Sequence, residues 1–231
     1  ARSINVMLDR LDQGVRQLSQ FSDDLAHELR TPLSNLMGKA QVTLARPRDS
    51  GDYREVLADS IEELTRLNRI INDMLFLAQV SQPQAQVELK PLALADEVAR
   101  LSELFAIIAE VKDIEIRRHG WATALGDRLM CQRALSNLLS NALRHSPEGS
   151  VVSIGIGRYA QQAWVWVENH GPGISDDHLP HLFERFYRAD SGRSRLDGGT
   201  GLGLAIVQSI MQLHGSQVEV SSQAQGPTRF T

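Results

Sequence analysis

Apolar side chains recur at regular intervals near the start of the chain and predict a long helix. Between Ile4 and Leu29 the intervals alternate between four and three residues, with Ser22 at one of the positions. This heptad repeat is typical of a coiled coil or a helical bundle. The apolar members of the repeat are Ile4, Leu8, Leu11, Val15, Leu18, Leu25 and Leu29.

A polar segment at 46–52, which contains Pro47 and Gly51, ends this helix and predicts a turn. A second helix is expected from about Tyr53 to Gln79, with a wide apolar face. Because a two-helix hairpin has too little apolar area to be stable alone, we expect two copies to form a four-helix bundle. The sequence therefore predicts a homodimer.

Residues 81–86 form a polar linker, after which strand-type and helix-type segments alternate. Because strand hairpins and helices interleave without a strict βαβ order, the pattern favours an α+β layer fold over a Rossmann fold. Strands are predicted near 87–89, 114–117, 122–125, 151–157, 163–168 and 217–221, and helices near 96–111, 128–145, 177–188 and 203–214.

Composition and charge narrow the class of protein. The chain has 231 residues, of which 42% are hydrophobic and 23% charged, as in ordinary globular proteins. A net charge of −4 gives no bulk attraction for nucleic acid or anionic membranes. The single cysteine, Cys131, excludes an internal disulfide framework and a cysteine-rich zinc site. No apolar run approaches the roughly 18 residues that span a bilayer. Because the chain opens in what looks like mid-helix, we expect a piece of a longer protein.

Residues 27–32 (H-E-L-R-T-P) place a histidine on the first helix. Leu25 faces the heptad seam, so His27, about 200° away, lies on the outer face, where a second domain can reach it. Glu28 can take a proton from the imidazole, which lets the other ring nitrogen attack phosphorus. Pro32 should bend the helix. A solvated histidine beside a solvated glutamate is the plainer interpretation. A zinc motif H-E-x-x-H is excluded, because Thr31 replaces the second histidine.

Two asparagines, Asn137 and Asn141, lie four residues apart on the helix predicted over 128–145. They share one face, which Arg144 and His145 continue by about one turn. Amide oxygens beside phosphate groups suit Mg²⁺. Surface asparagines on an ordinary amphipathic helix are the alternative interpretation.

Two glycine-containing turns follow, residues 169–174 (N-H-G-P-G-I) after a predicted strand and residues 199–204 (G-T-G-L-G-L) at the start of a predicted helix. Free N–H groups at a helix start bind phosphate. The polar stretch 190–198, with Arg193 and Arg195, is interpreted as a mobile lid. The glycine spacing fits neither a dinucleotide fingerprint nor a P-loop. A plain β-turn remains an alternative for the first turn.

The order and spacing of these motifs resemble those of a sensor histidine kinase over nearly the whole chain. Residues 1–80 resemble its dimerisation and histidine-phosphotransfer domain, with the end of a signal-relay helix at 1–18. Residues 87–231 resemble its catalytic ATP-binding domain, an α/β sandwich shared with gyrase-type ATPases, and 81–86 would be the linker. The resemblance implies an α+β fold whose N-terminal hairpin forms a dimeric four-helix bundle. It also implies the cytoplasmic portion of an inner-membrane protein.

The resemblance also implies roles for individual residues. His27 would be the phosphoryl acceptor and Glu28 its base, and Thr31 would position water when the partner is dephosphorylated. Asn141 would ligate Mg²⁺. Phe183 and Phe186 match the family's phenylalanine box, with Phe183 mainly packing in the core. The other residues implied to bind ATP are Asn137, Arg144, His145, Asn169, Gly171, Gly173, Ile174, Arg185, Arg188, Gly199, Thr200, Gly201, Leu202, Gly203, Leu204 and Thr228.

The implied reaction is ATP-dependent autophosphorylation of His27, followed by transfer to an aspartate of a response-regulator receiver domain and dephosphorylation of that regulator. Mg²⁺ and the helix start would hold the triphosphate, and motion about residues 81–86 would bring the histidine in line with the γ-phosphorus.

Several residues depart from the family pattern. Asn169 stands where the family usually has aspartate, and its amide oxygen should accept the adenine amino group more weakly. His145 and Pro227 replace an aromatic residue and a glycine. The pair 168–169 (E-N), with residues 73–79 (D-M-L-F-L-A-Q), resembles the heavy-metal or copper sensor branch.

Two other functions stay open on the sequence. A gyrase-type conformational ATPase shares the ATP-site motifs but not an outward-facing His27 on a heptad helix. A pseudokinase scaffold, which the replacement at Asn169 favours, would fail to bind Mg²⁺ and ATP.

Overall fold

A computed structural model of the protein describes residues 2–82, 84–189 and 199–231, and for residues 2–21 and 24 it describes the backbone alone. The chain divides into two compact units, Ala1–Met74 and Leu75–Thr231.

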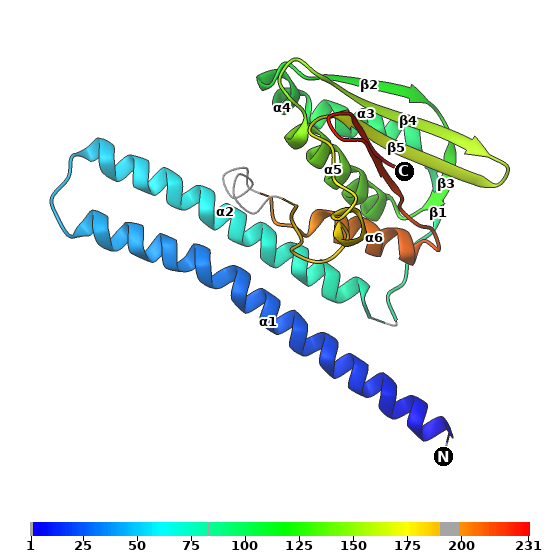
Figure 1. Ribbon diagram of the computed structural model, residues 1–231, viewed down its shortest axis with the longest axis horizontal. Coiled ribbons are helices and arrows are strands. Elements are labelled where there is room, and N and C mark those ends of the chain that lie inside the picture. The colour runs from blue at the N-terminus through cyan, green and yellow to red at the C-terminus, as the bar shows by residue number, and fades with distance from the viewer. Residues whose placement is uncertain (1, 83, 190–198) are drawn as a thin grey trace. The chain divides into compact units, whose positions relative to one another are not determined.

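The first unit is a helical hairpin of α1 (Arg2–Leu44) and most of α2 (Ser50–Val80), which run side by side in Figure 1. Both helices agree with the heptad and bundle patterns. The turn between them falls in the predicted break, where Asp49 accepts a hydrogen bond from the Asp52 N–H at 2.8 Å and caps α2. Helix α1 continues without interruption through Pro32.

The hairpin leaves large apolar side chains in water on both helices. Leu33 and Met37 of α1 are 51% and 56% exposed, and Leu57 and Ile61 of α2 are 62% and 65% exposed. An ion pair between Lys39 Nζ and Asp59 Oδ2, at 2.9 Å, joins the two helices. The hairpin alone therefore does not cover its own apolar surface.

The second unit is built on a five-stranded sheet with the strand order β2-β4-β5-β7-β6. Strand β2 pairs in parallel with β4, and the other neighbours are antiparallel. The other two strands form a separate small sheet. The strands are β1 (Lys90–Ala93), β2 (Glu115–Gly120), β3 (Thr123–Gly126), β4 (Val151–Tyr159), β5 (Gln162–His170), β6 (Val220–Ser222) and β7 (Pro227–Phe230).

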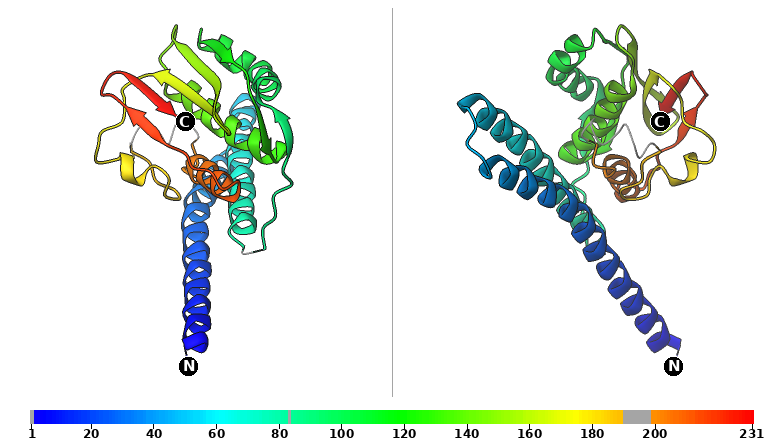
Figure 2. Two further views of the ribbon diagram at one scale, coloured as in Figure 1. Left: turned by 90° about the vertical axis from the view of Figure 1, so that its right-hand side faces the viewer. Right: turned by 60° about the vertical axis from the view of Figure 1, so that its left-hand side comes forward.

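Helices cover one side of this sheet, as Figures 1 and 2 show. Apolar side chains from both layers are buried between them, such as Leu139 and Ile206 of the helices and Val152 and Val167 of the strands. This arrangement confirms the predicted α+β class. The helices are α3 (Leu94–Leu104), α4 (Ala106–Val111), α5 (Arg128–His145) and α6 (Gly203–Leu213).

Several predicted elements were wrong or displaced. The helix expected over 177–188 is only a three-residue 3₁₀ helix, η1 (Leu179–His181), and the left-handed backbone of Phe186 (φ 63°) excludes a helix through that residue. The helix expected over 96–111 is divided at Phe105 into α3 and α4. The first strand lies at 90–93 rather than 87–89, in register with β3. Strand β7 was not predicted, since it is short and begins with proline.

The last turns of α2 are grouped with the sheet unit. The Arg133 guanidinium lies 4.0 Å from the centre of the Phe76 ring, and Leu77 is fully buried. Just beyond the helix, Ser81 Oγ accepts a hydrogen bond of 3.3 Å from Arg185 Nη2. The domain boundaries expected at residues 80 and 87 stay a prediction.

Candidate functional site

Helix α5 carries a polar face on which the two asparagines lie, as the sequence predicted. The Asp127 carboxylate accepts a hydrogen bond from the Met130 N–H at 3.0 Å and fixes the start of the helix. The opposite face of α5 is buried through residues such as Leu138 and Leu139. Asn137 and Asn141 are therefore held half-buried on a rigid element.

The start of α6 lies directly against this polar face. A Cβ atom added to Gly203 would lie 3.2 Å from Asn137 Oδ1, and one added to Gly199 would lie 2.5 Å from Arg144 Nη1. In the part of the chain that the structure describes, no side-chain cap is present at Leu202, the N-cap of α6, and Thr200 Oγ1 accepts a hydrogen bond from the Leu202 N–H at 3.3 Å. The first N–H groups of α6 are thus available to an anion beside Asn137 and Arg144.

Asn169, the last but one residue of β5, is a buried amide that is only 5% exposed. It is the register partner of Thr228 on β7, which is 6% exposed. Thr228 Oγ1 lies 2.6 Å from Ser222 Oγ, which accepts a hydrogen bond from the Ile174 N–H at 2.9 Å. These hydrogen bonds tie the 169–174 turn to the β6–β7 hairpin. Ser222 was missed by the sequence reasoning, because a lone strand serine carries no motif.

The first glycine turn also touches the end of α5. A Cβ atom added to Gly171 would lie 2.6 Å from the His145 carbonyl oxygen and 3.5 Å from Asn169 Nδ2. At Gly173 the backbone is left-handed (φ 75°), and a Cβ atom would lie 2.1 Å from the Gln223 carbonyl oxygen. Neither position leaves room for a side chain, so the glycines permit close packing of backbone around the Asn169 amide.

The phenylalanine segment supports the second glycine turn. The Phe186 N–H donates a hydrogen bond of 2.9 Å to the Gly201 carbonyl oxygen. Phe183 packs edge-on against Phe230, with ring centres 6.5 Å apart at 89°, in agreement with its expected core role. Arg185 points instead to Ser81 of the linker, and Arg188 ends the segment just before the expected lid at 190–198, which lies outside the described residues.

Two contacts that the sequence did not reveal hold α5 against its neighbours. Glu97 of α3, only 2% exposed, accepts hydrogen bonds from Gln132 Nε2 at 2.6 Å and from Arg100, and it pairs with Arg128 at 3.1 Å. Burial raises the pKa of Glu97, but these hydrogen bonds and charges outweigh it and hold the pKa below its ordinary value. On the other side, His214 Nε2 accepts a hydrogen bond from the Asp127 N–H at 3.0 Å.

Cys131 of α5 is an inert thiol beside these contacts. Burial, helped by the carboxylates of Asp127 and Glu97, raises its pKa to about 11. Its sulfur lies 3.9 Å from His214 Nε2. Among the described residues, no three His, Cys, Asp or Glu side chains come together to hold a metal ion.

The predicted residues of the hairpin belong to the first unit. On α1, His27 and Thr31 are exposed and Glu28 is half-exposed, while Pro32 is buried. The imidazole is thus open to an incoming group. The other predicted site residues that the structure describes lie in the second unit.

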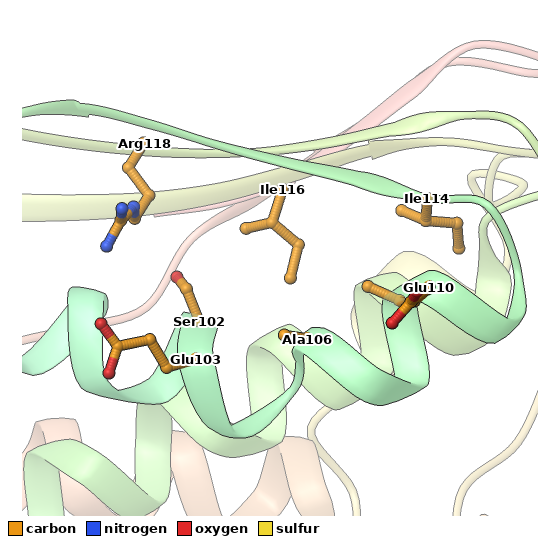
Figure 3. Close-up of a pocket in the computed structure, with 8 residues that line it drawn as sticks. Ser102, Glu103, Ala106, Glu110, Ile114, Ile116 and Arg118 are labelled. Carbon is orange, nitrogen blue, oxygen red and sulfur yellow. The ribbon is translucent and has the colours of Figure 1, made fainter.

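A separate pocket of about 410 Å³ opens between α3, α4 and β2, on residues such as Ser102, Glu110 and Ile116 (Figure 3). None of the predicted site residues lines it. The candidate site is therefore the face shared by α5, the two glycine turns and the start of α6.

Two protein-family models match the chain. Residues 17–83 match the His Kinase A (phospho-acceptor) domain, and residues 126–231 match the histidine kinase-, DNA gyrase B- and HSP90-like ATPase. Each match covers the motifs on which the corresponding sequence prediction rests.

Named relatives match the chain over almost its full length. Sensor protein IrlS of Burkholderia pseudomallei is 45% identical over 99% of the chain and 49% of its own length. Sensor histidine kinase CusS of Escherichia coli K12 is 44% identical over 99% of the chain and 48% of its own length. The chain thus spans about half the length of these relatives. In the part of the chain that is described, no helix is long and apolar enough to cross a membrane.

The fold also agrees with solved structures. Histidine kinase ThkA, in complex with the response regulator protein TrrA, superposes with a TM-score of 0.77 at 20% identity, covering 95% of this chain and 62% of that one. This likeness concerns the fold.

Proposed function

The chain belongs to the sensor histidine kinases of two-component systems, and from this premise we propose that it transfers the γ-phosphoryl group of ATP to His27. The observation that carries the proposal is the meeting of three separate sequence motifs within the second unit. Asn137 and Arg144, the start of α6, Gly171 and the buried Asn169 come together through contacts that leave no room for side chains at the glycines.

The geometry suits a nucleoside triphosphate. The uncapped N–H groups of α6 and the Arg144 guanidinium would hold phosphate oxygens. The amide oxygen of Asn169, opposite Thr228, would accept the adenine amino group. Mg²⁺, held by Asn141 and the phosphates, would neutralise charge on the triphosphate. These assignments agree with the ATPase family match over 126–231.

His27 meets the requirements of an acceptor. Its imidazole is exposed on α1, and Glu28 follows it on the same helix. One ring nitrogen would attack the γ-phosphorus while Glu28 takes the proton from the other, and the bond from the γ-phosphorus to the bridging oxygen breaks to release ADP. Thr31, one turn further on, would position water when the partner aspartyl phosphate is hydrolysed.

We also propose that the hairpin dimerises. The exposed apolar residues of α1 and α2 lie on the two helices that the His Kinase A match covers. Burying them against a second copy would form a four-helix bundle and remove that surface from water.

The wider function is proposed from the family. The phosphohistidine would pass its group to an aspartate of a response-regulator receiver domain, as the ThkA complex with TrrA suggests. The 168–169 and 73–79 motifs support the heavy-metal or copper sensor branch. The chain would then be the cytoplasmic portion of an inner-membrane sensor, whose sensing half precedes it.

The test is autophosphorylation with γ-labelled ATP and Mg²⁺ on the wild type, His27→Gln and His119→Gln. His119 is an exposed histidine at the end of β2 and serves as the matched control. Label should enter the wild type and the control only, and it should be lost in acid and kept in base. Label that persists in His27→Gln would refute the acceptor, and ATP binding without any labelling would indicate a scaffold.

A further inference from the structure

The segment from His178 to Tyr187 is closed by a hydrogen bond between the side chains at its two ends. His178 Nδ1 lies 2.7 Å from Tyr187 Oη, nine residues along the chain. Both side chains are half-buried. The only regular structure between them is the 3₁₀ helix of Leu179–His181, so this bond is a direct side-chain link between the two ends of an irregular segment.

The two halves of the segment are anchored differently. The first half is fixed to the core by Leu182, which is 9% exposed, and by the ring contact of Phe183. In the second half, the Tyr187 N–H donates a hydrogen bond of 3.3 Å to the Glu184 carbonyl oxygen, and the Phe186 N–H donates one of 2.9 Å to the Gly201 carbonyl oxygen. The His178–Tyr187 bond joins this second half to the start of the segment.

The second half carries the contact that supports the glycine turn. Phe186 has a left-handed backbone (φ 63°), which a phenylalanine adopts only where its surroundings impose it. Its N–H donates to the Gly201 carbonyl oxygen, and its Cα would lie 2.8 Å from a Cβ atom at Gly201. Gly201 stands two residues before Gly203, the first residue of α6.

We propose that His178 and Tyr187 are positioning residues for the nucleotide. Their hydrogen bond holds Phe186 in its left-handed conformation, and the Phe186 backbone in turn holds the glycine turn that presents the start of α6 to the phosphates. Both residues act through the backbone and not by touching the ligand. The inference rests on the proposed nucleotide site.

The test uses Tyr187→Phe, which removes the hydroxyl and keeps the ring against His181, whose centre is 5.4 Å away. Loss of one ordinary hydrogen bond predicts that the Kd of a non-hydrolysable ATP analogue with Mg²⁺ rises about three- to tenfold. The KM for ATP should rise by the same factor, while the autophosphorylation rate at saturating ATP stays within about twofold. Tyr159→Phe, at a tyrosine that is 82% exposed, is the matched control and should leave the affinity unchanged.

The partner residue supplies a second comparison. His178→Asn keeps a polar atom near the place of Nδ1 and should retain most of the affinity, whereas His178→Leu should lose as much as Tyr187→Phe. The double variant of Tyr187→Phe and His178→Leu should bind no more weakly than either single variant, because all three lose the same bond.

Unchanged affinity in Tyr187→Phe, or losses that add in the double variant, would overturn the proposal. Urea unfolding of each variant shows whether it is folded. If the affinity falls only in variants that no longer show a cooperative unfolding transition, the positioning role is refuted. A wild-type protein that does not bind the analogue would instead refute the nucleotide site, and the positioning role with it.

Discussion

Alanine substitutions at Gly201 and Gly203 should have different results, although the two glycines stand in one motif. At Gly201 the backbone is left-handed (φ 72°), and a Cβ atom would lie 2.8 Å from both Cα and C of Phe186. Gly203 begins α6 outside the left-handed region, and the nearest neighbour of its Cβ would be Asn137 Oδ1 at 3.2 Å. The first contact is with backbone, and the second is with a side chain that can turn.

These contacts set the size of the effect. An alanine at a left-handed position costs roughly 1–2 kcal/mol, and a forced backbone contact adds about 1–3 kcal/mol. Gly201→Ala should therefore oppose the present turn by about 2–5 kcal/mol, which weakens nucleotide binding by roughly 30-fold or more. Gly203→Ala should stabilise the fold by about 0.4–1 kcal/mol, because alanine makes the unfolded chain less flexible. Since the contact of the new Cβ atom with Asn137 Oδ1 is mild, the affinity of this variant for the nucleotide should stay within about fivefold of the wild type.

The measurement is calorimetric titration of each variant with a non-hydrolysable ATP analogue and Mg²⁺, with urea unfolding to confirm that the second unit folds. The reasoning fails if the two variants bind equally well, or if Gly203→Ala is the weaker. In either case the distances at Phe186 would not control the turn.

Two further substitutions test the polar contacts of the site. Asn169→Asp should tighten the binding of the ATP analogue by about five- to tenfold at pH 8, because a carboxylate accepts the adenine amino group more strongly than an amide. The same change should lower the urea midpoint of the ligand-free protein, because the charge would be buried at a position only 5% exposed, and weaker binding would contradict the adenine assignment. Glu97→Gln should reduce the free energy of unfolding by about 1–3 kcal/mol at pH 7. The folded-state pKa of Glu97 lies below its ordinary value of 4.5. The wild type should therefore lose this extra stability as the pH falls through that lower pKa. Equal dependence of the unfolding free energy on pH in wild type and variant would refute the role of the carboxylate.

Local signals in the sequence were sufficient for helix α5. Its observed bounds equal the predicted ones, because Asp127 caps its start and a continuous apolar face runs to His145. Asn137 and Asn141 were placed on one face by spacing alone. Asn137 lies close to Gly203 because α5 packs against α6. No local sequence pattern predicts this packing.

The segment around Phe186 shows where local signals fail. Residues 177–188 carry helix-compatible side chains, but only Leu179–His181 form a short 3₁₀ helix. The Phe186 N–H bonds instead to the distant Gly201 carbonyl oxygen. The contributions of Ser222 and Glu97 were missed for a similar reason. Each is an ordinary residue on its own element, and each gains its role from partners far along the chain, Ile174 for Ser222 and Gln132 for Glu97.

The low reactivity expected of the Cys131 thiol makes this protein convenient for site-specific labelling. With a pKa of about 11, roughly one thiol in a thousand is ionised at pH 8, so the lone native cysteine should react slowly with maleimide or iodoacetamide probes. A cysteine introduced at an exposed position of α1 and another at the end of β2 should therefore take up a fluorophore pair selectively in the unaltered background. Energy transfer between the two dyes would then test in real time whether the distance between the two units changes during turnover.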